Sequence, residues 1–407
     1  MNESNRRKMK ELASFYSERL LEAMRFWEVR TEDKECGGYL TCFDRTGNVT
    51  DTDKYIWFQG RQLWMFPALY NQVEKRQLWL DLAQVGRDFI VEKAYAGSGR
   101  WRYQLDRQGN EKQGTISIYT DHFVLEGLCE YAAATDSEED MPLIVATYDA
   151  IERNMQDPEF KDLFHDVWDA RYKQLGAHMI TMDVASVVSK VLGAKKTKPL
   201  IDYCLEQILY VFAQDEYEAV FECIGRDGRV LTDESKTRTL NPGHSMESVW
   251  FSIEAAKAQG NTAAVERAIT IAEWMYSRGY DKEHGGLFSF LDCSGEEPVL
   301  TAWHKETNVQ WHDKVWWAHS EALFALALVA VETESDTWFE RFVDLHDWCW
   351  KCFHDAEYGE WYPELYRDGT VKLADKGTLW KAAYHLPRAL MKVMQVFEEY
   401  EDGRRKR

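Results

Sequence analysis

The chain has 407 residues, a formal net charge of −20 and an apolar fraction of 45%. A protein this acidic is repelled by nucleic acid and by anionic lipid, so neither is expected as a partner. The apolar content is enough for a large core.

Residues 1–8 lack the apolar core of a signal peptide. The richest apolar stretch, 323–331, is shorter than the roughly 20 residues of a membrane span. Eight cysteines without a secretory signal are typical of reduced thiols. We therefore expect a cytoplasmic protein with no membrane span.

Five segments repeat one pattern, in which an aromatic-rich strand, a turn with glycine and a second short strand predict a β-hairpin. The segments are 38–47, 101–109, 220–228, 286–295 and 360–369. The interval between the second and third segments is nearly twice the others, so a degenerate sixth copy is expected near Asp166–Lys173.

Between the hairpins the apolar residues follow a helical period, which predicts twelve helices, about two per repeat. Their expected spans are 8–28, 57–72, 75–93, 117–135, 141–155, 176–193, 197–213, 244–259, 262–278, 313–332, 335–353 and 377–400. A single repeat cannot bury its apolar face alone, so the repeats must stack. Six helix pairs closing into a ring predict an all-α (α/α)6 barrel with short β-hairpins, as one domain over residues 1–407. An open helical solenoid is the alternative.

Polar and aromatic residues gather where the even-numbered helices are expected to begin. Because helix N-termini present free N–H groups and a partial positive charge, this arrangement suits an anionic intermediate. The residues concerned are Tyr55, Arg61, His122, His244, Glu247, Trp316, His319, Glu321, Trp380 and His385.

Two histidines are the leading candidates. His244 follows a Pro-Gly turn, and Glu247 lies one helical turn later, within reach of the imidazole. His385 precedes Leu386-Pro387 and could also be a core histidine. His122, His178 and His284 are weaker candidates.

A buried Arg61 needs an anion or a carboxylate, which could be a ligand or an ion pair with Glu247 or Glu321. His319 and Glu321 are two residues apart and therefore point to different faces of one helix. At most one of them is expected to face the interior of a barrel.

Several motifs together resemble the N-acylglucosamine 2-epimerase family, which includes cellobiose and mannose 2-epimerases and aldose–ketose isomerases. They are Tyr55-Ile56-Trp57-Phe58-Gln59-Gly60-Arg61-Gln62, Asn241-Pro242-Gly243-His244-Ser245-Met246-Glu247, His284-Gly285-Gly286-Leu287-Phe288, Trp316-Trp317-Ala318-His319-Ser320-Glu321-Ala322 and His385-Leu386-Pro387-Arg388. The resemblance covers nearly the whole chain, and the family's (α/α)6 barrel agrees with the repeat count.

The resemblance implies that His244 and His385 are the two acid/base catalysts, one removing the proton at C2 of an open-chain sugar and the other returning it to the opposite face. The expected substrate-binding residues are Tyr55, Arg61, Glu247, Trp316, His319, Glu321 and Trp380. The implied reaction interconverts N-acyl-D-glucosamine and N-acyl-D-mannosamine, requires no metal or redox cofactor, and is carried out by a homodimer. Some family members are activated by ATP, and no nucleotide motif decides that point here.

Substrate markers point in two directions. The sixth helix reads Met179-Ile180-Thr181-Met182-Asp183-Val184, without the histidine that cellobiose epimerases carry there, and His319 stands where they tend to have glutamine. Both features resemble the N-acylglucosamine branch, whereas Trp380 resembles a cellobiose-epimerase stacking residue.

Three alternatives stay open. An epimerase or an aldose–ketose isomerase of unmodified sugars shares the same site, since protonation at C1 instead of C2 yields a ketose. A glycoside hydrolase or lyase could use Glu247 and Glu321 as its two carboxylates, with both histidines remote. A non-catalytic sugar-binding or scaffold protein is the third.

Overall fold

The computed structural model describes residues 1–157, 160, 171–299 and 307–403. It forms two compact units, and each draws on separate stretches of the chain. Unit 1 comprises Met1–Phe26, Ile208–Asp375 and His385–Arg407, and unit 2 comprises Trp27–Gln207 and Lys376–Tyr384. The single domain expected over residues 1–407 therefore stays a prediction.

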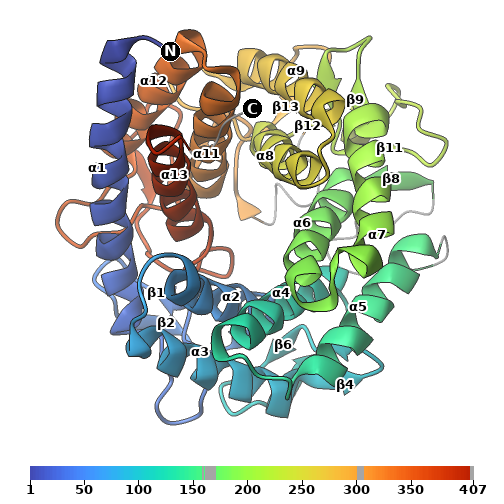
Figure 1. The fold of residues 1–407 in the computed structure, drawn as a ribbon, viewed down its shortest axis with the longest axis vertical. Helices are drawn as coiled ribbons and strands as arrows, with labels where there is room; N and C mark the ends of the chain where they lie inside the picture. Colours follow the sequence, from blue (N-terminus) through green and yellow to red (C-terminus); the bar gives the residue numbers. More distant parts are fainter. Residues whose placement is uncertain (158–159, 161–170, 300–306, 404–407) are drawn as a thin grey trace. The chain divides into compact units, whose positions relative to one another are not determined.

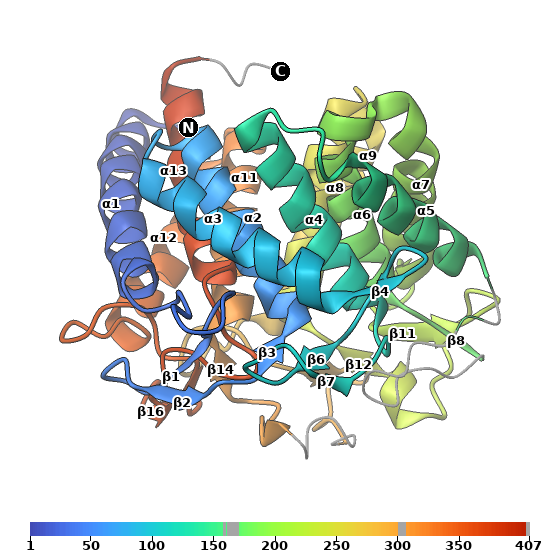
Figure 2. The same ribbon diagram turned by 90° about the horizontal axis from the view of Figure 1, so that it is seen from below.

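Unit 2 has three inner helices, each backed by one outer helix. Helix α2 packs on α4 and α4 on α6, while α3, α5 and α7 cover them in turn. The helices are α2 (Ile56–Gln72), α3 (Gln77–Phe89), α4 (Ile118–Thr135), α5 (Met141–Gln156), α6 (Leu175–Leu192) and α7 (Ala194–Glu206), with a π-helical turn η1 (Ile90–Ala94) after α3. The unit's strands are β1 (Cys42–Phe43), β2 (Val49–Asp51), β3 (Lys54–Tyr55), β4 (Tyr95–Gly97), β5 (Arg100–Trp101), β6 (Gln104–Leu105), β7 (Glu111–Gln113) and β8 (Tyr172–Gln174). Figure 2 shows β3, β6 and β7 together at the start of α2.

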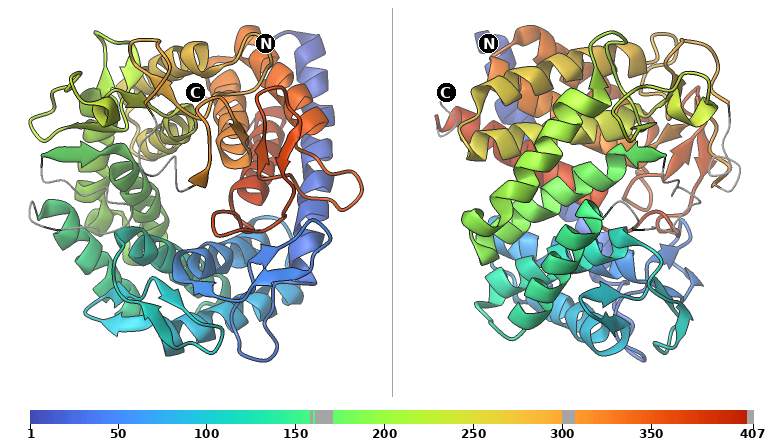
Figure 3. Two further views of the ribbon diagram at one scale, coloured as in Figure 1. Left: turned by 180° about the vertical axis from the view of Figure 1, so that it is seen from behind. Right: turned by 90° about the vertical axis from the view of Figure 1, so that its right-hand side faces the viewer.

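Unit 1 repeats this plan. Helix α11 packs on both α8 and α13, with α9 behind α8 and α12 behind α11 (Figure 1). The helices are α1 (Glu3–Glu28), α8 (Pro242–Ala258), α9 (Thr262–Gly279), α11 (Trp316–Thr333), α12 (Asp336–Cys352) and α13 (His385–Glu401), with short turns η3 (Gln207–Phe212) and η4 (Ser235–Thr237). The strands are β9 (Ala213–Gln214), β10 (Ala219–Val220), β11 (Cys223–Gly225), β12 (Thr239–Leu240), β13 (Leu291–Asp292), β14 (Lys314–Val315), β15 (Glu364–Leu365) and β16 (Val371–Leu373). Figure 3 shows the β14–β15–β16 sheet, which leads into α11.

The inner and outer helices differ in how much of their surface is buried. In the outer helix α9 the buried residues Ala264, Ala268, Ile271, Ala272 and Met275 form one stripe. In the inner helix α11, by contrast, every residue from Ala318 to Val331 is buried. Inner helices therefore carry their few polar side chains into the interior.

The predicted helices have counterparts among the described residues, and the largest difference is at the last one. It was expected from residue 377, but α13 begins at His385. Gly377 bridges to Phe43, and the Lys381 ammonium donates to the Lys376 carbonyl, so this segment joins unit 2 as irregular chain. The apolar residues of this segment therefore belong to an irregular loop and not to a helix.

Three of the five predicted hairpins form as expected, namely β1–β2, β6–β7 and β15–β16. All five turn glycines have positive φ, which only glycine adopts without strain. The fourth segment differs, because β13 pairs with the earlier strand β12. The sixth copy expected near Asp166–Lys173 lies mostly outside the described residues.

Helix α6 is long and apolar enough, by length and composition, to cross a membrane, and half of that stretch is buried. Sequence analysis placed the richest apolar run in α11 instead. Helix α6 packs on α4 and α7, and core helices of soluble proteins have the same composition.

Lysines anchor two inner helices at the same position. Lys54, at the end of the strand before α2, contacts Asp33 at 2.9 Å, and Lys314, before α11, contacts Asp281 at 3.0 Å. Both lysines are fully buried, and an arginine from a later hairpin also binds each aspartate. Paired and hydrogen-bonded charges of this kind tie the helix start to the preceding loop.

Three inner helices carry a buried histidine near their first turn. His122, His178 and His319 each place Nδ1 at 2.7 Å from the carbonyl oxygen four residues earlier. Because a carbonyl only accepts, Nδ1 carries the hydrogen in each.

Close approach of α2 and α4 depends on two glycines. A Cβ atom on Gly60 would lie 2.5 Å from the Phe123 backbone, and one on Gly127 would lie 2.7 Å from the Gly60 carbonyl oxygen. Backbone atoms cannot move aside as a flexible side chain can, so an added methyl group pushes the helices apart.

We predict that Gly60→Ala and Gly127→Ala each lower the free energy of unfolding by about 1–3 kcal/mol, measured by urea denaturation. The matched control is Gly114→Ala, whose added Cβ makes only an ordinary contact of 3.4 Å with Glu111. Equal stability of the three variants would contradict the close-packing argument.

A second prediction concerns pH. Burial lowers the pKa of four imidazoles, to about 4 for His122, His178 and His346 and to about 3 for His319. The unfolded chain protonates these groups near pH 6.5 and the folded chain does not. Their contribution to stability is therefore complete above pH 6.5 and is lost as the pH falls toward the folded-state values, at about 1.4 kcal/mol per pH unit for each group.

The free energy of unfolding, measured in urea between pH 7 and pH 5, should therefore fall with decreasing pH, with net uptake of more than one proton on unfolding. A flat profile across this range would show that the buried imidazoles are protonated in the folded chain.

Candidate active site

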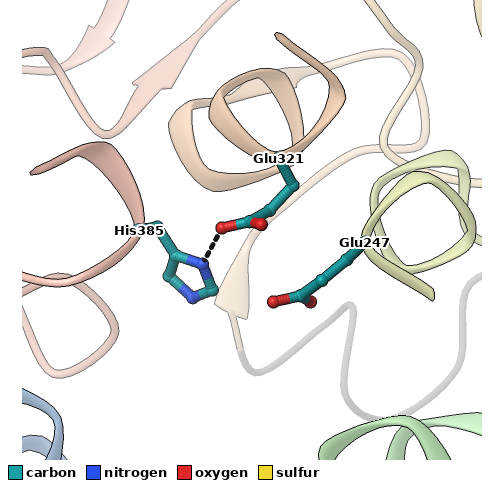
Figure 4. Close-up of side chains that lie close together, drawn as sticks. All are labelled: Glu247, Glu321 and His385. Carbon is teal, nitrogen blue, oxygen red and sulfur yellow. Dashed lines mark hydrogen bonds and ion pairs between the residues drawn. The ribbon is translucent and has the colours of Figure 1, made fainter. Parts of the chain in front are cut away.

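A buried histidine–carboxylate pair occupies the starts of α11 and α13 in unit 1. His385 Nδ1 lies 2.7 Å from Glu321 Oε1 (Figure 4). A carboxylate only accepts, so Nδ1 carries the hydrogen, and Nε2 of the neutral ring bears none. Sequence analysis named both residues, and the structure brings them together.

Arg388 joins this pair to Glu247. Its Nη2 atom lies 2.5 Å from Glu247 Oε1 and 2.8 Å from Glu321 Oε1. The guanidinium is 1% exposed and also packs over the Trp250 ring at 5.0 Å. Charge-assisted hydrogen bonds among fully buried groups fix the relative positions of α8, α11 and α13.

The two carboxylates ionise differently. Burial raises the pKa of Glu247, and the nearby charge of Glu321 raises it further, against the opposing charges of Arg388 and His244. For Glu321 burial also favours protonation, but the charge of Arg388 and the contacts with His385 outweigh it and lower the pKa. Glu321 is therefore the anion of the pair.

His244 forms a second histidine–carboxylate pair. It lies in the first turn of α8, where Asn241 caps the helix by accepting from the His244 backbone N–H at 3.1 Å. Its Nδ1 is 2.8 Å from Glu222 Oε2. As in the first pair, the carboxylate accepts from Nδ1–H, so Nε2 of the neutral ring bears no hydrogen.

One indole ring contacts both imidazoles. The Trp317 ring centroid lies 5.0 Å from that of His244 and 5.8 Å from that of His385. Trp316 adds an edge-on contact with His385 at 6.4 Å. The two candidate acid/base groups therefore share one aromatic wall within unit 1.

Among the described residues, one group has the donor set for a metal ion, since ligand atoms of Glu247, Glu321 and His385 lie within 4.8 Å of one another. Arg388 already supplies a positive charge to both carboxylates. A cation placed there must displace or repel that guanidinium, so the geometry favours a site without a metal.

The same contacts oppose the hydrolase alternative, which required both histidines to be remote from Glu247 and Glu321. His385 is instead hydrogen-bonded to Glu321. Both oxygens of Glu321 are occupied, Oε1 by His385 and Arg388 and Oε2 by the Trp250 indole N–H at 2.9 Å.

His319 is hydrogen-bonded at both ring nitrogens, and its predicted role in substrate binding stays a prediction. Its side chain is fully buried, Nε2 accepts from the Leu287 backbone N–H at 2.8 Å, and Nδ1 donates to the Val315 carbonyl. Its ring stacks on Trp348. Both nitrogens are occupied by the backbone, and the residue fastens α11 to the loop before β13.

The remaining predicted residues lie in unit 2. The buried Arg61 guanidinium packs over Phe123, Trp57 and Tyr384, at 4.0, 4.9 and 4.9 Å from the ring centroids. Trp380 meets Trp57 edge-on at 5.7 Å.

Tyr55 precedes α2, and its hydroxyl oxygen accepts a hydrogen bond from Gln104 at 3.0 Å. Burial and the charges of Asp51 and Asp53 raise its pKa to about 12. The ion pair expected between Arg61 and Glu247 or Glu321 stays a prediction, and Arg388 is the cation found between those two carboxylates.

Sequence reasoning assigned no role to Glu222 or Arg388. Arg388 stands three residues after His385, the spacing that places two side chains on one helix face, so its position was a usable signal. Glu222 has no such signal, because it reaches His244 from a separate hairpin.

The family model of N-acylglucosamine 2-epimerase matches residues 38–389. The N-acylglucosamine 2-epimerase of Bos taurus is 32% identical over 383 residues, which cover 90% of this chain and 86% of the relative.

Two solved structures share the fold. The cellobiose 2-epimerase of Bacillus thermoamylovorans B4167 matches with a TM-score of 0.81 at 19% identity, covering 95% of this chain and 99% of its own. A D-mannose isomerase matches with a TM-score of 0.81 at 19% identity, covering 94% of this chain and 97% of its own. The predicted all-α (α/α)6 fold class is thereby confirmed.

A match over most of its length and two histidine–glutamate pairs show that this chain belongs to the N-acylglucosamine 2-epimerase family and is a carbohydrate epimerase or isomerase.

Proposed function

We propose that the protein interconverts N-acyl-D-glucosamine and N-acyl-D-mannosamine by inverting C2. One observation carries the mechanism: two imidazoles that contact the same indole ring each have Nδ1 hydrogen-bonded to a carboxylate, which selects the tautomer whose Nε2 bears no hydrogen. The choice of an N-acylated sugar is supported by relatives of that name at about 30% identity.

In the proposed reaction the sugar is in its open-chain form, so that C2 lies beside the aldehyde. Nε2 of one histidine takes the C2 proton, and the electrons of the C–H bond move to the carbonyl oxygen as an enediolate or its 2-acylamino counterpart. The second histidine, protonated at Nε2, gives its proton to the opposite face of C2. Each imidazole ends with the protonation state that the other had at the start, and the reverse reaction uses the same groups.

Glu321 supports His385 in this cycle by holding one tautomer and by stabilising the imidazolium that forms, as a buried carboxylate does in other histidine pairs. Arg388 and Trp250 keep Glu321 ionised and in place. We propose that the substrate-binding set is the one that the resemblance implies, namely Tyr55, Arg61, Glu247, Trp316, His319, Glu321 and Trp380.

Proton transfer alone accounts for the reaction, so we propose that it requires no cofactor. A homodimer located in the cytoplasm, with ATP as a candidate activator, completes the proposal.

The proposal is tested in D2O with N-acetylmannosamine, N-acetylglucosamine, mannose and cellobiose, each with and without ATP, by following the C2 proton by NMR. We expect exchange and 2-epimer formation with the two N-acetyl sugars. We also expect His244→Ala and His385→Ala to abolish epimerisation, whereas His354→Ala should retain it, because His354 follows the end of α12 and contacts Glu22.

Exchange with mannose or cellobiose alone would reassign the substrate to unmodified sugars. A ketose product would identify an aldose–ketose isomerase. Absence of exchange with all four sugars would overturn the proposed function.

A second prediction isolates the Glu321 carboxylate. Glu321→Gln should lower kcat about a hundredfold or more, because the neutral amide stabilises the His385 imidazolium less. Glu340→Gln, an exposed glutamate on α12, is the control and should leave kcat unchanged. Activity of Glu321→Gln within threefold of wild type would exclude an acid/base role for the His385 pair.

A further inference from the structure

The carboxylate of the His244–Glu222 pair comes from a segment other than the helix that carries the histidine. Glu222 comes from the chain between β10 and β11, and its backbone N–H donates to the Thr239 carbonyl at 3.2 Å. Thr239 begins β12, the strand that leads through Asn241 into α8. This backbone bond therefore sets Glu222 against the helix turn that carries His244.

The two carboxylates differ in how their charge is balanced. Glu321 receives hydrogen bonds from His385, Arg388 and Trp250, and Arg388 adds a full positive charge. Glu222 Oε2 receives His244, while its other oxygen is covered by protein atoms and has no hydrogen-bond partner among the described residues. A covered carboxylate oxygen without a donor is costly, and the cost is smallest when the imidazole beside it is positively charged.

We propose that Glu222 is a positioning residue for the C2 inversion, holding His244 Nδ1–H and stabilising the His244 imidazolium that donates a proton to C2. Glu222 acts through His244 and does not contact the sugar. The inference rests on the proposed function, since it assigns His244 one of the two proton transfers.

A proton-transfer role leaves a signature that a structural role does not. In a two-base reaction, His385 removes the C2 proton of the epimer whose C2 hydrogen points toward it. It still does so when His244 is slow to deliver a proton to the other face. The intermediate then returns to the starting sugar after exchanging its proton with solvent. Impairing the His244 side therefore produces exchange without inversion for one epimer, and not for the other.

The test compares Glu222→Gln with Glu222→Asp, and with Glu216→Gln as the matched control, an exposed glutamate in the β9–β10 turn. Each variant is incubated in D2O with either N-acetyl epimer separately, and the rates of C2 deuteration and of inversion are measured by NMR. Circular dichroism and the thermal unfolding midpoint show whether each variant is folded.

We expect Glu222→Gln to lower kcat about tenfold to a hundredfold with KM within a factor of about two, because the amide still accepts from Nδ1–H but carries no charge. The ratio of deuteration to inversion should rise for one epimer only. Glu222→Asp should recover part of the activity, and Glu216→Gln should match wild type.

An equal ratio for both epimers in folded Glu222→Gln, or unchanged kcat, would overturn the positioning role. If every variant exchanges and inverts the sugars as fast as the wild-type protein, the positioning role is likewise overturned, but the proposed function stands. Absence of exchange in the wild-type protein would instead reject the proposed function itself.

Discussion

The guanidinium of Arg388, placed between two buried carboxylates, is the interaction on which the site depends. Three inner helices of unit 1 contribute to it, Glu247 from α8, Glu321 from α11 and Arg388 from α13. Two glutamates this close cannot both remain ionised in a water-excluded interior without a cation. Arg388 supplies that cation and keeps Glu321 ionised. His385 is therefore hydrogen-bonded to a negatively charged carboxylate.

Tautomer control follows from the same arrangement. A free imidazole exchanges its hydrogen between two nitrogens, and only one arrangement presents Nε2 as a base. Glu321 and Glu222 remove this freedom at His385 and His244, so both rings are prepared before a sugar arrives. In the proposed reaction, rings held in this way need no reorientation during proton transfer, where it would add to the barrier.

Much of this could be read from the sequence. Helical periodicity located most helices to within about five residues, the last one excepted, and the glycine turns located three hairpins, because both signals are local. His244, His385, Glu247 and Glu321 were recognisable from motifs at helix starts.

Other features depend on contacts between distant segments. Whether Arg61 or Arg388 met the glutamates could not be decided from spacing, since each begins a different inner helix. His319 looked functional by position, yet its environment is set by Leu287 from another loop. The 376–384 segment has helix-forming residues but is held by a bridge to Phe43.

The buried Lys54–Asp33 and Lys314–Asp281 anchors have a consequence for how the scaffold can change. In each pair the aspartate precedes a hairpin segment and the lysine follows it, close before an inner helix, so the ion pair ties the helix start to the loop on the other side of that segment. The chain between the two partners can therefore change in length and side chains without displacing the helix. A scaffold organised in this way lets the chain between each aspartate and lysine diversify while the inner helices stay in register.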